Sequence, residues 1–189
     1  MQLPAIPFWF IRHGQTRYNA AGLAQGAIDA DLNETGRAQV EQAGPLLQGR
    51  GITEILSSPL RRTRETTDIL NRFLHVPVSY EPDLREVSFG DQEGQVSQPW
   101  FPEWIAGRYT PENGESFAVL QARVGAALCR ILPARPGLKL IVAHGGVLRA
   151  VRDLMGLPRE GITGNAIPLY CEPTAQGWQV VSDPPIDAK

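Results

Sequence analysis

Cysteine is scarce in this sequence of 189 residues, which contains only Cys129 and Cys171. Two cysteines so far apart in the chain cannot build the disulfide framework of a small secreted domain, and no group of Cys and His residues has the spacing of a zinc site. We therefore expect two free thiols in a reducing compartment, which favours the cytoplasm.

Positive charge is not in excess either, because the 18 Lys and Arg residues are balanced by 20 Asp and Glu residues and the formal net charge is -2. Proteins that bind nucleic acid or an anionic lipid surface usually carry a basic patch. We therefore expect neither nucleic acid nor a membrane among the partners, while a local cationic pocket remains compatible with this charge.

Long hydrophobic stretches are also missing, and a composition of 42% hydrophobic and 20% charged residues is that of ordinary soluble globular proteins. The apolar stretch LPAIPFWFI has no basic leading region, so we expect it to form a first strand and not a signal peptide. The length suffices for one well-packed domain and is short for two, so we expect a single domain over residues 1–189.

Apolar runs of strand length alternate with segments of helical periodicity. The runs lie at 8–11, 52–56 and 138–143, with weaker ones at 167–171 and 178–181, and the helical segments lie at about 34–49, 60–74, 116–132 and 146–155. This alternation predicts an α/β fold, a three-layer αβα sandwich with a mostly parallel central sheet. We expect the last two strands to be antiparallel at an edge.

Two segments depart from this regularity. Gly44-Pro45 interrupts the helical spacing of 34–49, so we expect this helix to be kinked or split. Residues 87–115 are rich in Pro, Gly and aromatic residues and show no sustained period. A connection of this length is typical of a functional loop or lid.

Three polar clusters occupy the same kind of position, the point at which a strand gives way to a helix or loop. They are RHG at 12–14, SSPLRRTRET at 57–66 and AHGG at 143–146. In a parallel sheet these junctions lie along one edge, and two of them also present free backbone N–H groups at a helix start. The pattern predicts one shared anion pocket.

The chain has only three histidines, His13, His75 and His144. We expect His75 to be structural, because it lies between a leucine and a valine with no polar partner nearby. His13 and His144 are each followed by glycine, which would let the backbone approach a ligand closely. Arg12, beside His13, adds a fixed planar cation suited to phosphate oxygens.

Three arginines, Arg61, Arg62 and Arg64, open the helix expected to begin at Pro59 or Leu60. Cations at a helix N-terminus oppose the helix dipole unless an anion lies there too. We therefore expect one of the three to point into the pocket, and we expect Arg61 and Arg64 to be solvated.

Four motifs together resemble those of the histidine phosphatase superfamily, which contains phosphoglycerate mutases and many phosphatases. They are RHGxTxxN at 12–19, SSxLxRTxxT at 57–66, LxExxFGxxEG at 84–94 and HGGVLR at 144–149. RHG alone is a weak signal, but four motifs in the right order extend over most of the chain. The resemblance implies a phosphoglycerate mutase-like fold.

The resemblance also implies a role for each matching residue. His13 would be the nucleophile that accepts the phosphoryl group, and Glu86 would protonate the leaving oxygen, for which we expect a partly apolar environment near Phe89. The residues that would bind the phosphate are Arg12, Asn19, Arg62, His144 and Gly145. This chemistry needs positioning and charge neutralisation, and we expect no metal or other cofactor.

Two enzymatic functions fit the resemblance. A mutase for phosphoglycerate must bind a carboxylate as well, which requires extra cations. Between Val87 and Glu115 the only Lys or Arg is Arg108, whereas acidic and aromatic residues are frequent. Such a lid suits an apolar or aromatic leaving group. We therefore expect a phosphatase of small phosphorylated metabolites, with phosphoglycerate mutase-type transfer as the alternative.

Three further interpretations stay open. The aromatic residues of the lid are equally compatible with a core or with a contact in a homodimer. A protein phosphatase acting on phosphohistidine is another alternative, although such relatives are shorter and lack a counterpart of Glu86. A catalytically silent module that binds a phospho-ligand or a protein is the alternative outside enzymes. The joint presence of His13, Arg12, Arg62, His144 and Glu86 argues against it.

Overall fold

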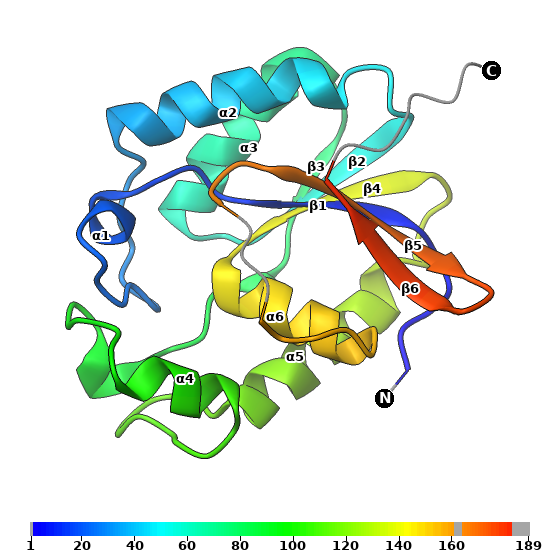
Figure 1. Cartoon of the computed structure of the whole chain (residues 1–189). Coiled ribbons are helices and arrows are strands. Elements are labelled where there is room, and N and C mark those ends of the chain that lie inside the picture. Colours follow the sequence, from blue (N-terminus) through cyan, green and yellow to red (C-terminus); the bar gives the residue numbers. More distant parts are fainter. Residues whose placement is uncertain (1, 161–163, 183–189) are drawn as a thin grey trace.

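A twisted six-stranded sheet forms the centre of the molecule, shown in Figure 1. The structure is a computed structural model that describes residues 2–160 and 164–182. The strands are β1 (Phe8–Arg12), β2 (Ile52–Ser57), β3 (Val78–Tyr80), β4 (Leu138–Ala143), β5 (Pro168–Thr174) and β6 (Gly177–Val181). Their order across the sheet is β3-β2-β4-β1-β5-β6.

The first four strands in this order are parallel, whereas β5 is antiparallel to β1 and β6 is antiparallel to β5. The prediction of a mostly parallel sheet with an antiparallel pair at one edge is therefore confirmed. The sequence analysis missed β3, because this edge strand has only three residues and none of them is fully buried.

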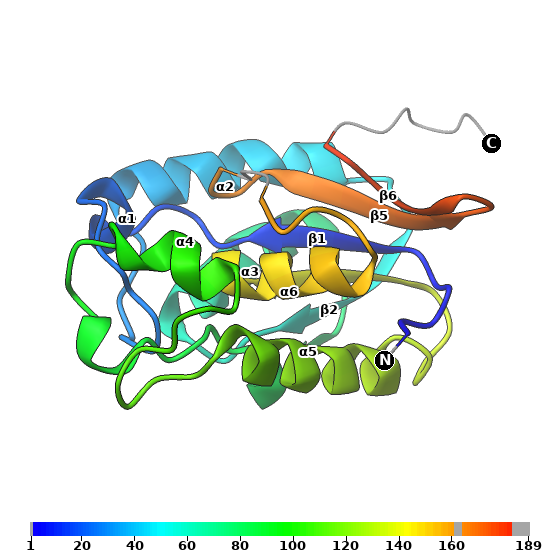
Figure 2. The same ribbon diagram turned by 60° about the horizontal axis from the view of Figure 1, so that its bottom comes forward.

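Helices cover both faces of the sheet. They are α1 (Arg17–Ala20), α2 (Glu34–Leu47), α3 (Arg61–Leu74), α4 (Trp100–Ile105), α5 (Phe117–Ile131) and α6 (Gly145–Leu154), with 3₁₀ turns η1 (Pro82–Leu84) and η2 (Gly90–Gln92). Figures 1 and 2 show α2 and α3 on one face and α5 and α6 on the other, which confirms the three-layer αβα sandwich. Within the described residues, no helix has the length and apolarity needed to cross a bilayer.

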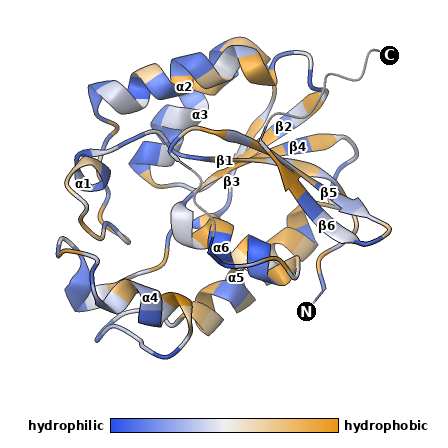
Figure 3. Ribbon diagram, viewed as in Figure 1, coloured by the Kyte–Doolittle hydropathy of each residue, from blue (hydrophilic) through white to orange (hydrophobic). Residues whose placement is uncertain are grey.

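Strand β1 is buried on both faces, which explains its uninterrupted apolar sequence. Phe8 and Phe10 pack into the core beneath α5 and α6, whereas Trp9 and Ile11 pack into the core beneath α2 and α3. Figure 3 shows the same division, with hydrophobic strands between helices whose outer faces are polar. The strand is therefore held rigidly up to its last residue, Arg12.

The split expected at Gly44-Pro45 in the segment 34–49 is wrong, because α2 continues through Pro45 as one helix, while the alternative of a kink stays a prediction. Pro45 lies in the last turn and has no N–H to donate to Glu41 O, so α2 lacks one backbone hydrogen bond near its C-terminus. Gly44 is required by packing, since an added Cβ would lie 2.3 Å from a ring atom of Phe73 on α3.

The segment 87–115 is more ordered than its sequence predicts, since it contains η2 and α4. Trp104 of α4 is fully buried, donates a hydrogen bond from Nε1 to Glu115 O at 3.0 Å, and packs edge-on against Phe89 and Phe117. For Trp104 the interpretation as a core residue is therefore correct. We call 87–115 the lid segment, because two of its aromatic side chains border the cavity described next.

Candidate active site

A cavity of about 290 Å³ opens at the carboxyl ends of β1 and β4, the edge of the sheet predicted from the sequence. Its lining comes from the end of β1 and the loop after it, the starts of α3 and α6, Glu86 and the lid segment, and the loop before β5. The charged and polar lining residues are Arg12, His13, Asn19, Gln25, Arg62, Glu86, Ser97, Arg149 and Asn165, and Phe89 and Phe101 form the aromatic wall.

His13 follows the last residue of β1, and its backbone N–H still pairs with Ala143 O of β4 at 3.0 Å. Its ring nitrogen Nδ1 lies 2.7 Å from Gly14 O. A carbonyl oxygen can only accept, so Nδ1 carries the proton and Nε2 has the free lone pair. Burial, followed by the charges of Arg62 and Arg12, holds the pKa of His13 well below its usual value, and the imidazole is therefore neutral.

Arg62 is the arginine of α3 that points into the pocket, and only 1% of its surface is exposed. Its Nη1 and Nη2 donate to Ile28 O and Gly26 O, each at 2.8 Å, and its Nε donates to Nδ1 of His144 at 3.2 Å. Burial lowers the pKa of Arg62 to about 10, so the guanidinium stays charged at neutral pH. The loop after β1 therefore fixes the orientation of this cation.

His144 is the N-cap residue of α6 and is completely buried. Its Nδ1 accepts the bond from Arg62, so its Nε2 carries the proton and donates to Ser58 Oγ at 2.7 Å. Burial and the charge of Arg62 hold the pKa of His144 well below its usual value. The rings of His13 and His144 are 5.3 Å apart between centroids, but His144 does not itself line the cavity.

Arg12 and Asn19 complete the predicted phosphate contacts. Burial is the main cause that lowers the pKa of Arg12, while the nearby Glu86 carboxylate raises it. The Nε atom of Arg12 is buried and has no hydrogen-bond partner among the described residues. Asn19 Oδ1 accepts from Thr16 N at 3.1 Å and from Asn165 Nδ2 at 3.3 Å, which leaves the Asn19 amide nitrogen as a donor for a ligand.

Glu86 reaches the start of α6 from the lid side. Its two carboxylate oxygens accept from Val87 N at 3.1 Å and from Gly146 N at 2.9 Å. Gly146 makes this approach possible, because a Cβ there would lie 2.4 Å from Glu86 Oε1. The environment is mixed, since Glu86 shares the cavity with Phe89 as expected but is also held by two backbone N–H groups.

Gly14 was expected to let the backbone approach a ligand, but the structure gives a different reason for a glycine at this position. A Cβ at Gly14 would lie 2.5 Å from Gly36 O, so the missing side chain lets the loop after β1 pass against the start of α2. Gly145 does line the cavity, and a Cβ there would meet Arg12 only at 3.5 Å. Packing against α2 therefore accounts for Gly14, whereas close approach to a ligand at Gly145 stays a prediction.

The remaining candidates lie where the sequence analysis placed them. Arg61 is exposed and forms an ion pair with Asp31 at 3.3 Å, and Arg64 stacks over the Tyr80 ring at 4.1 Å. The helix α3 begins at Arg61, with Leu60 as its N-cap. His75 is the C-cap residue at the other end of α3 from Arg62 and does not line the cavity.

Four polar cavity residues, Gln25, Ser97, Arg149 and Asn165, were not identified as site residues from the sequence. Gln25 is buried and accepts from Thr16 Oγ1 at 2.8 Å, and Asn165 donates from Nδ2 to His13 O at 2.9 Å. Neither belongs to a motif, so no sequence signal identifies them. Arg149 ends the HGGVLR motif and follows Gly145 by four residues, a spacing that places both on one face of a helix.

Across residues 2–160 and 164–182, no three His, Cys, Asp or Glu side chains are grouped as metal ligands. The cavity instead gathers three guanidinium groups, of Arg12, Arg62 and Arg149, around one carboxylate, that of Glu86. This excess of positive charge suits a phosphate dianion.

A sequence profile described as histidine phosphatase superfamily (branch 1) matches residues 8–181. The chain belongs to this superfamily. The uncharacterized phosphatase PhoE of Bacillus subtilis (strain 168) is 33% identical over 142 residues, which cover 75% of this chain and 72% of that protein. The probable phosphoglycerate mutase GpmB of Photorhabdus laumondii is 35% identical over 169 residues, covering 81% of this chain and 76% of that protein.

Solved structures of histidine phosphatases share the fold over nearly the whole length. A mycobacterial glucosyl-3-phosphoglycerate phosphatase in complex with VO3 has a TM-score of 0.83 and 29% identity, covering 94% of this chain and 98% of its own. A putative alpha-ribazole-5'-P phosphatase of Escherichia coli has a TM-score of 0.80 and 26% identity, covering 97% and 98%. The phosphoglycerate mutase-like architecture implied by the four motifs is thus confirmed.

Proposed function

We propose that the protein is a metal-independent phosphomonoesterase that hydrolyses a small phosphorylated metabolite through a phosphohistidine intermediate on His13. The observation that carries this proposal is the state of the His13 ring. Its proton is held on Nδ1 by Gly14 O at 2.7 Å, and burial together with Arg62 and Arg12 lowers its pKa. The Nε2 lone pair is therefore available at neutral pH beside cations that would hold the phosphoryl group.

The phosphoryl oxygens would be bound by Arg12, Arg62, the amide nitrogen of Asn19 and the backbone N–H of Gly145. Arg12 brings a buried Nε–H that has no acceptor among the described residues, and an oxygen atom of an anion would accept its hydrogen bond. Gly145 is the first residue of α6, where free N–H groups and the helix dipole favour negative charge. In this scheme His144 acts through Arg62, whose orientation it fixes.

The first chemical step is attack of His13 Nε2 on phosphorus. The N–P bond forms while the P–O ester bond breaks, and Glu86 gives its proton to the leaving alcohol oxygen. In the second step a water molecule attacks phosphorus, Glu86 takes the water proton, and the N–P bond breaks to release phosphate. Gly14 O holds the Nδ1 proton throughout, which stabilises the positive charge of the phosphorylated ring.

A phosphoglycerate mutase is the second candidate, and the names of relatives such as the GpmB proteins favour it. The lid segment favours a phosphatase. Its single cation, Arg108, is exposed and forms a two-pronged ion pair with Glu103, and it does not line the cavity. It therefore offers no charge to a substrate that has to be retained for a second transfer.

A cytoplasmic location, a single domain and a homodimer remain predictions attached to this function. The two free cysteines, Cys129 and Cys171, agree with a reducing compartment.

The test is hydrolysis of p-nitrophenyl phosphate in excess EDTA. We expect wild type to turn over and His13→Ala to lose at least about 1000-fold in kcat. Glu86→Gln should lose about 100-fold or more with alkyl phosphates, whose leaving oxygen needs the proton. His75→Ala is the matched control, since it removes an exposed histidine at the far end of α3.

Activity that survives in His13→Ala would refute the phosphohistidine mechanism. Inactive wild type would direct the test to mutase activity primed with 2,3-bisphosphoglycerate, and failure there together with phosphate binding would identify a silent binding module.

A further inference from the structure

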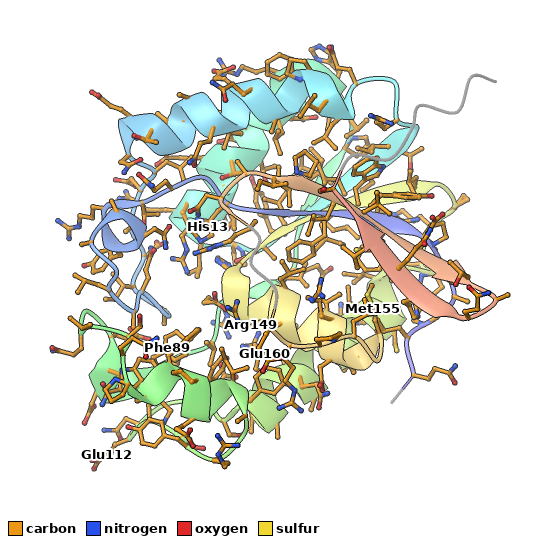
Figure 4. All side chains as sticks on the ribbon, viewed as in Figure 1. His13, Phe89, Glu112, Arg149, Met155 and Glu160 are labelled. Atoms are coloured by element: carbon orange, nitrogen blue, oxygen red, sulfur yellow. The ribbon has the colours of Figure 1, made fainter. Side chains whose placement is uncertain are left out.

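Asn165 lines the cavity but has no part in the two chemical steps above. It lies in the loop that leads into β5, and its Nδ2 is 2.9 Å from His13 O and 3.3 Å from Asn19 Oδ1. In Figure 4, His13 lies at the end of β1, beside the ribbon that leads into β5. One carboxamide thus joins the backbone of the proposed nucleophile to a side chain expected to bind the phosphate.

The orientation of the Asn165 carboxamide follows from its partners. His13 O is a carbonyl oxygen and can only accept, so the nitrogen end of Asn165 faces it. An amide nitrogen has two protons, and the second is directed to Asn19 Oδ1. Both protons of Asn165 Nδ2 are therefore engaged with oxygen atoms of the protein.

The orientation of the Asn19 side chain depends on such contacts to its oxygen. Asn19 Oδ1 accepts from Thr16 N at 3.1 Å and from Thr16 Oγ1 at 3.2 Å, within the N-terminal cap of α1. This helix has only four residues, and a helix so short is not stable by itself. Asn165 adds a contact from outside α1, next to the buried strand β1. With its oxygen held by the protein, Asn19 presents its amide nitrogen to the cavity.

The loop that carries Asn165 is fixed on the end of β1. Ala166 N donates to Arg12 O at 2.9 Å, and the Ala166 side chain is buried. The φ angle of Ala166 is 56°, a left-handed conformation that residues other than glycine rarely adopt. Such strain persists only where the surrounding structure enforces it, and it is concentrated at active sites. The backbone therefore holds the Asn165 side chain in place beside His13 O.

We propose that Asn165 is a positioning residue for the phosphoryl site, which directs the amide nitrogen of Asn19 toward a phosphate oxygen. The inference rests on the proposed phosphatase function and adds a residue that acts on the phosphate through Asn19. Asn165 Nδ2 has no further proton to donate to the phosphate, because both are used within the protein. Its effect on phosphate binding therefore depends on the presence of the Asn19 side chain.

The test is a double-mutant cycle with Asn165→Ala, Asn19→Ala and the double variant. The readouts are the inhibition constant of inorganic phosphate and the kcat/KM of p-nitrophenyl phosphate in excess EDTA. We expect Asn19→Ala to raise the inhibition constant about tenfold, the range of one hydrogen bond to a charged group. Asn165→Ala should raise it about threefold to tenfold in wild type, and less than about twofold when Asn19 is already alanine.

Asn165→Leu is the second variant, because leucine has a similar branched shape and removes the hydrogen bonds while it fills the space. It should show the same dependence on Asn19, and it replaces Asn165→Ala in the cycle if that variant does not fold. Asn71→Ala is the matched control, since it removes a carboxamide that bonds Val76 N at the end of α3 and does not line the cavity. It should lower the melting temperature and leave the inhibition constant unchanged.

Three outcomes would overturn the inference. Equal effects of Asn165→Ala in the wild-type and Asn19→Ala backgrounds would show that Asn165 acts independently of Asn19. An unchanged inhibition constant in Asn19→Ala would leave Asn165 nothing to position. A rise that Asn71→Ala reproduces would show that lost stability alone accounts for the effect.

The two proposals can fail separately. Turnover by wild type and its loss in His13→Ala report on the phosphatase function. Calorimetric binding of inorganic phosphate to His13→Ala, with and without the Asn19 and Asn165 substitutions, repeats the cycle without turnover. An inactive wild type with the expected coupling in binding would refute the phosphatase and support the role of Asn165, whereas turnover without coupling would do the opposite.

Discussion

Arg62 and His144 are joined by a hydrogen bond from Nε to Nδ1 at 3.2 Å, although they lie 82 residues apart in the chain. His144 in turn has its Nε2 2.7 Å from Ser58 Oγ. Both nitrogens of the imidazole are thus occupied by protein partners, and the ring is locked in one orientation. The cation that faces the cavity is therefore positioned by a buried chain of polar groups that substrate does not need to touch.

Ser58→Ala tests this arrangement, because it leaves the buried Nε2–H of His144 without an acceptor. We expect a loss of about 1–3 kcal/mol in the free energy of unfolding and a fall of about tenfold in kcat/KM as Arg62 loses its fixed orientation. Ser57→Ala is the matched control, since it removes a neighbouring buried hydroxyl that bonds Ser58 O and Thr67. Equal kinetic effects in both variants would contradict the positioning role.

Stability should fall as the pH drops below about 6.5, the unfolded value for histidine. Burial lowers the pKa of both His13 and His144 in the folded chain, so below 6.5 the unfolded chain binds protons that the folded chain does not. Each such histidine contributes a slope of about 1.4 kcal/mol per pH unit between its folded and unfolded pKa. Urea unfolding at pH 5 to 7 should show a shallower slope in His144→Gln than in wild type, and identical slopes would disprove the linkage.

Gly14→Ala should reduce stability, whereas Gly145→Ala should mainly weaken substrate binding. Gly14→Ala places a Cβ 2.5 Å from Gly36 O and should cost about 1–3 kcal/mol in stability, because backbone has to move. Gly145→Ala meets Arg12 only at 3.5 Å, so the fold should tolerate it while the new methyl group enters the cavity and raises KM. Thermal melts and initial rates distinguish the two, and a large loss of stability in Gly145→Ala would be unexpected.

Trp104→Ala should be the most destabilising change in the lid segment, by about 3–5 kcal/mol. The side chain is fully buried and also bonds Glu115 O, so its removal leaves a cavity between Phe89 and Phe117. Phe101→Ala is the comparison, because this partly buried ring borders the active-site cavity. We expect Phe101→Ala to change KM more than stability, and similar unfolding free energies for both variants would refute this division.

Most of the fold could be predicted from local sequence patterns. The runs that became β1, β2 and β4 are mainly apolar because most of their residues are covered on both faces of the sheet, and the stripe of α5 has a regular helical period. The short elements β3 and α4 could not be predicted, since three and six residues are too few to show a period. The split expected at Pro45 is wrong, since α2 continues through the proline with Val40, Ala43 and Leu47 buried in the core.

Some residues of the active site could likewise be predicted from the sequence, and others could not. Motifs identified His13, Arg62 and Glu86 because each follows or begins a regular element at a recognisable spacing. Gln25 and Asn165 could not be identified, because both lie in loops whose sequence has no motif, and only the folding of these loops places them at the cavity.

The sequence by itself determined the alternation of strands and helices, the superfamily and the polar residues at the strand ends, because these depend on neighbours along the chain. Only the tertiary structure decided the protonation of His13 on Nδ1, the bond between Arg62 and His144, and the position of Arg149 beside Phe101. Each of these features depends on contacts between elements that are distant in the sequence, or on the burial and the nearby charges that these contacts create. Their energies depend on distances and on desolvation that only the folded chain creates.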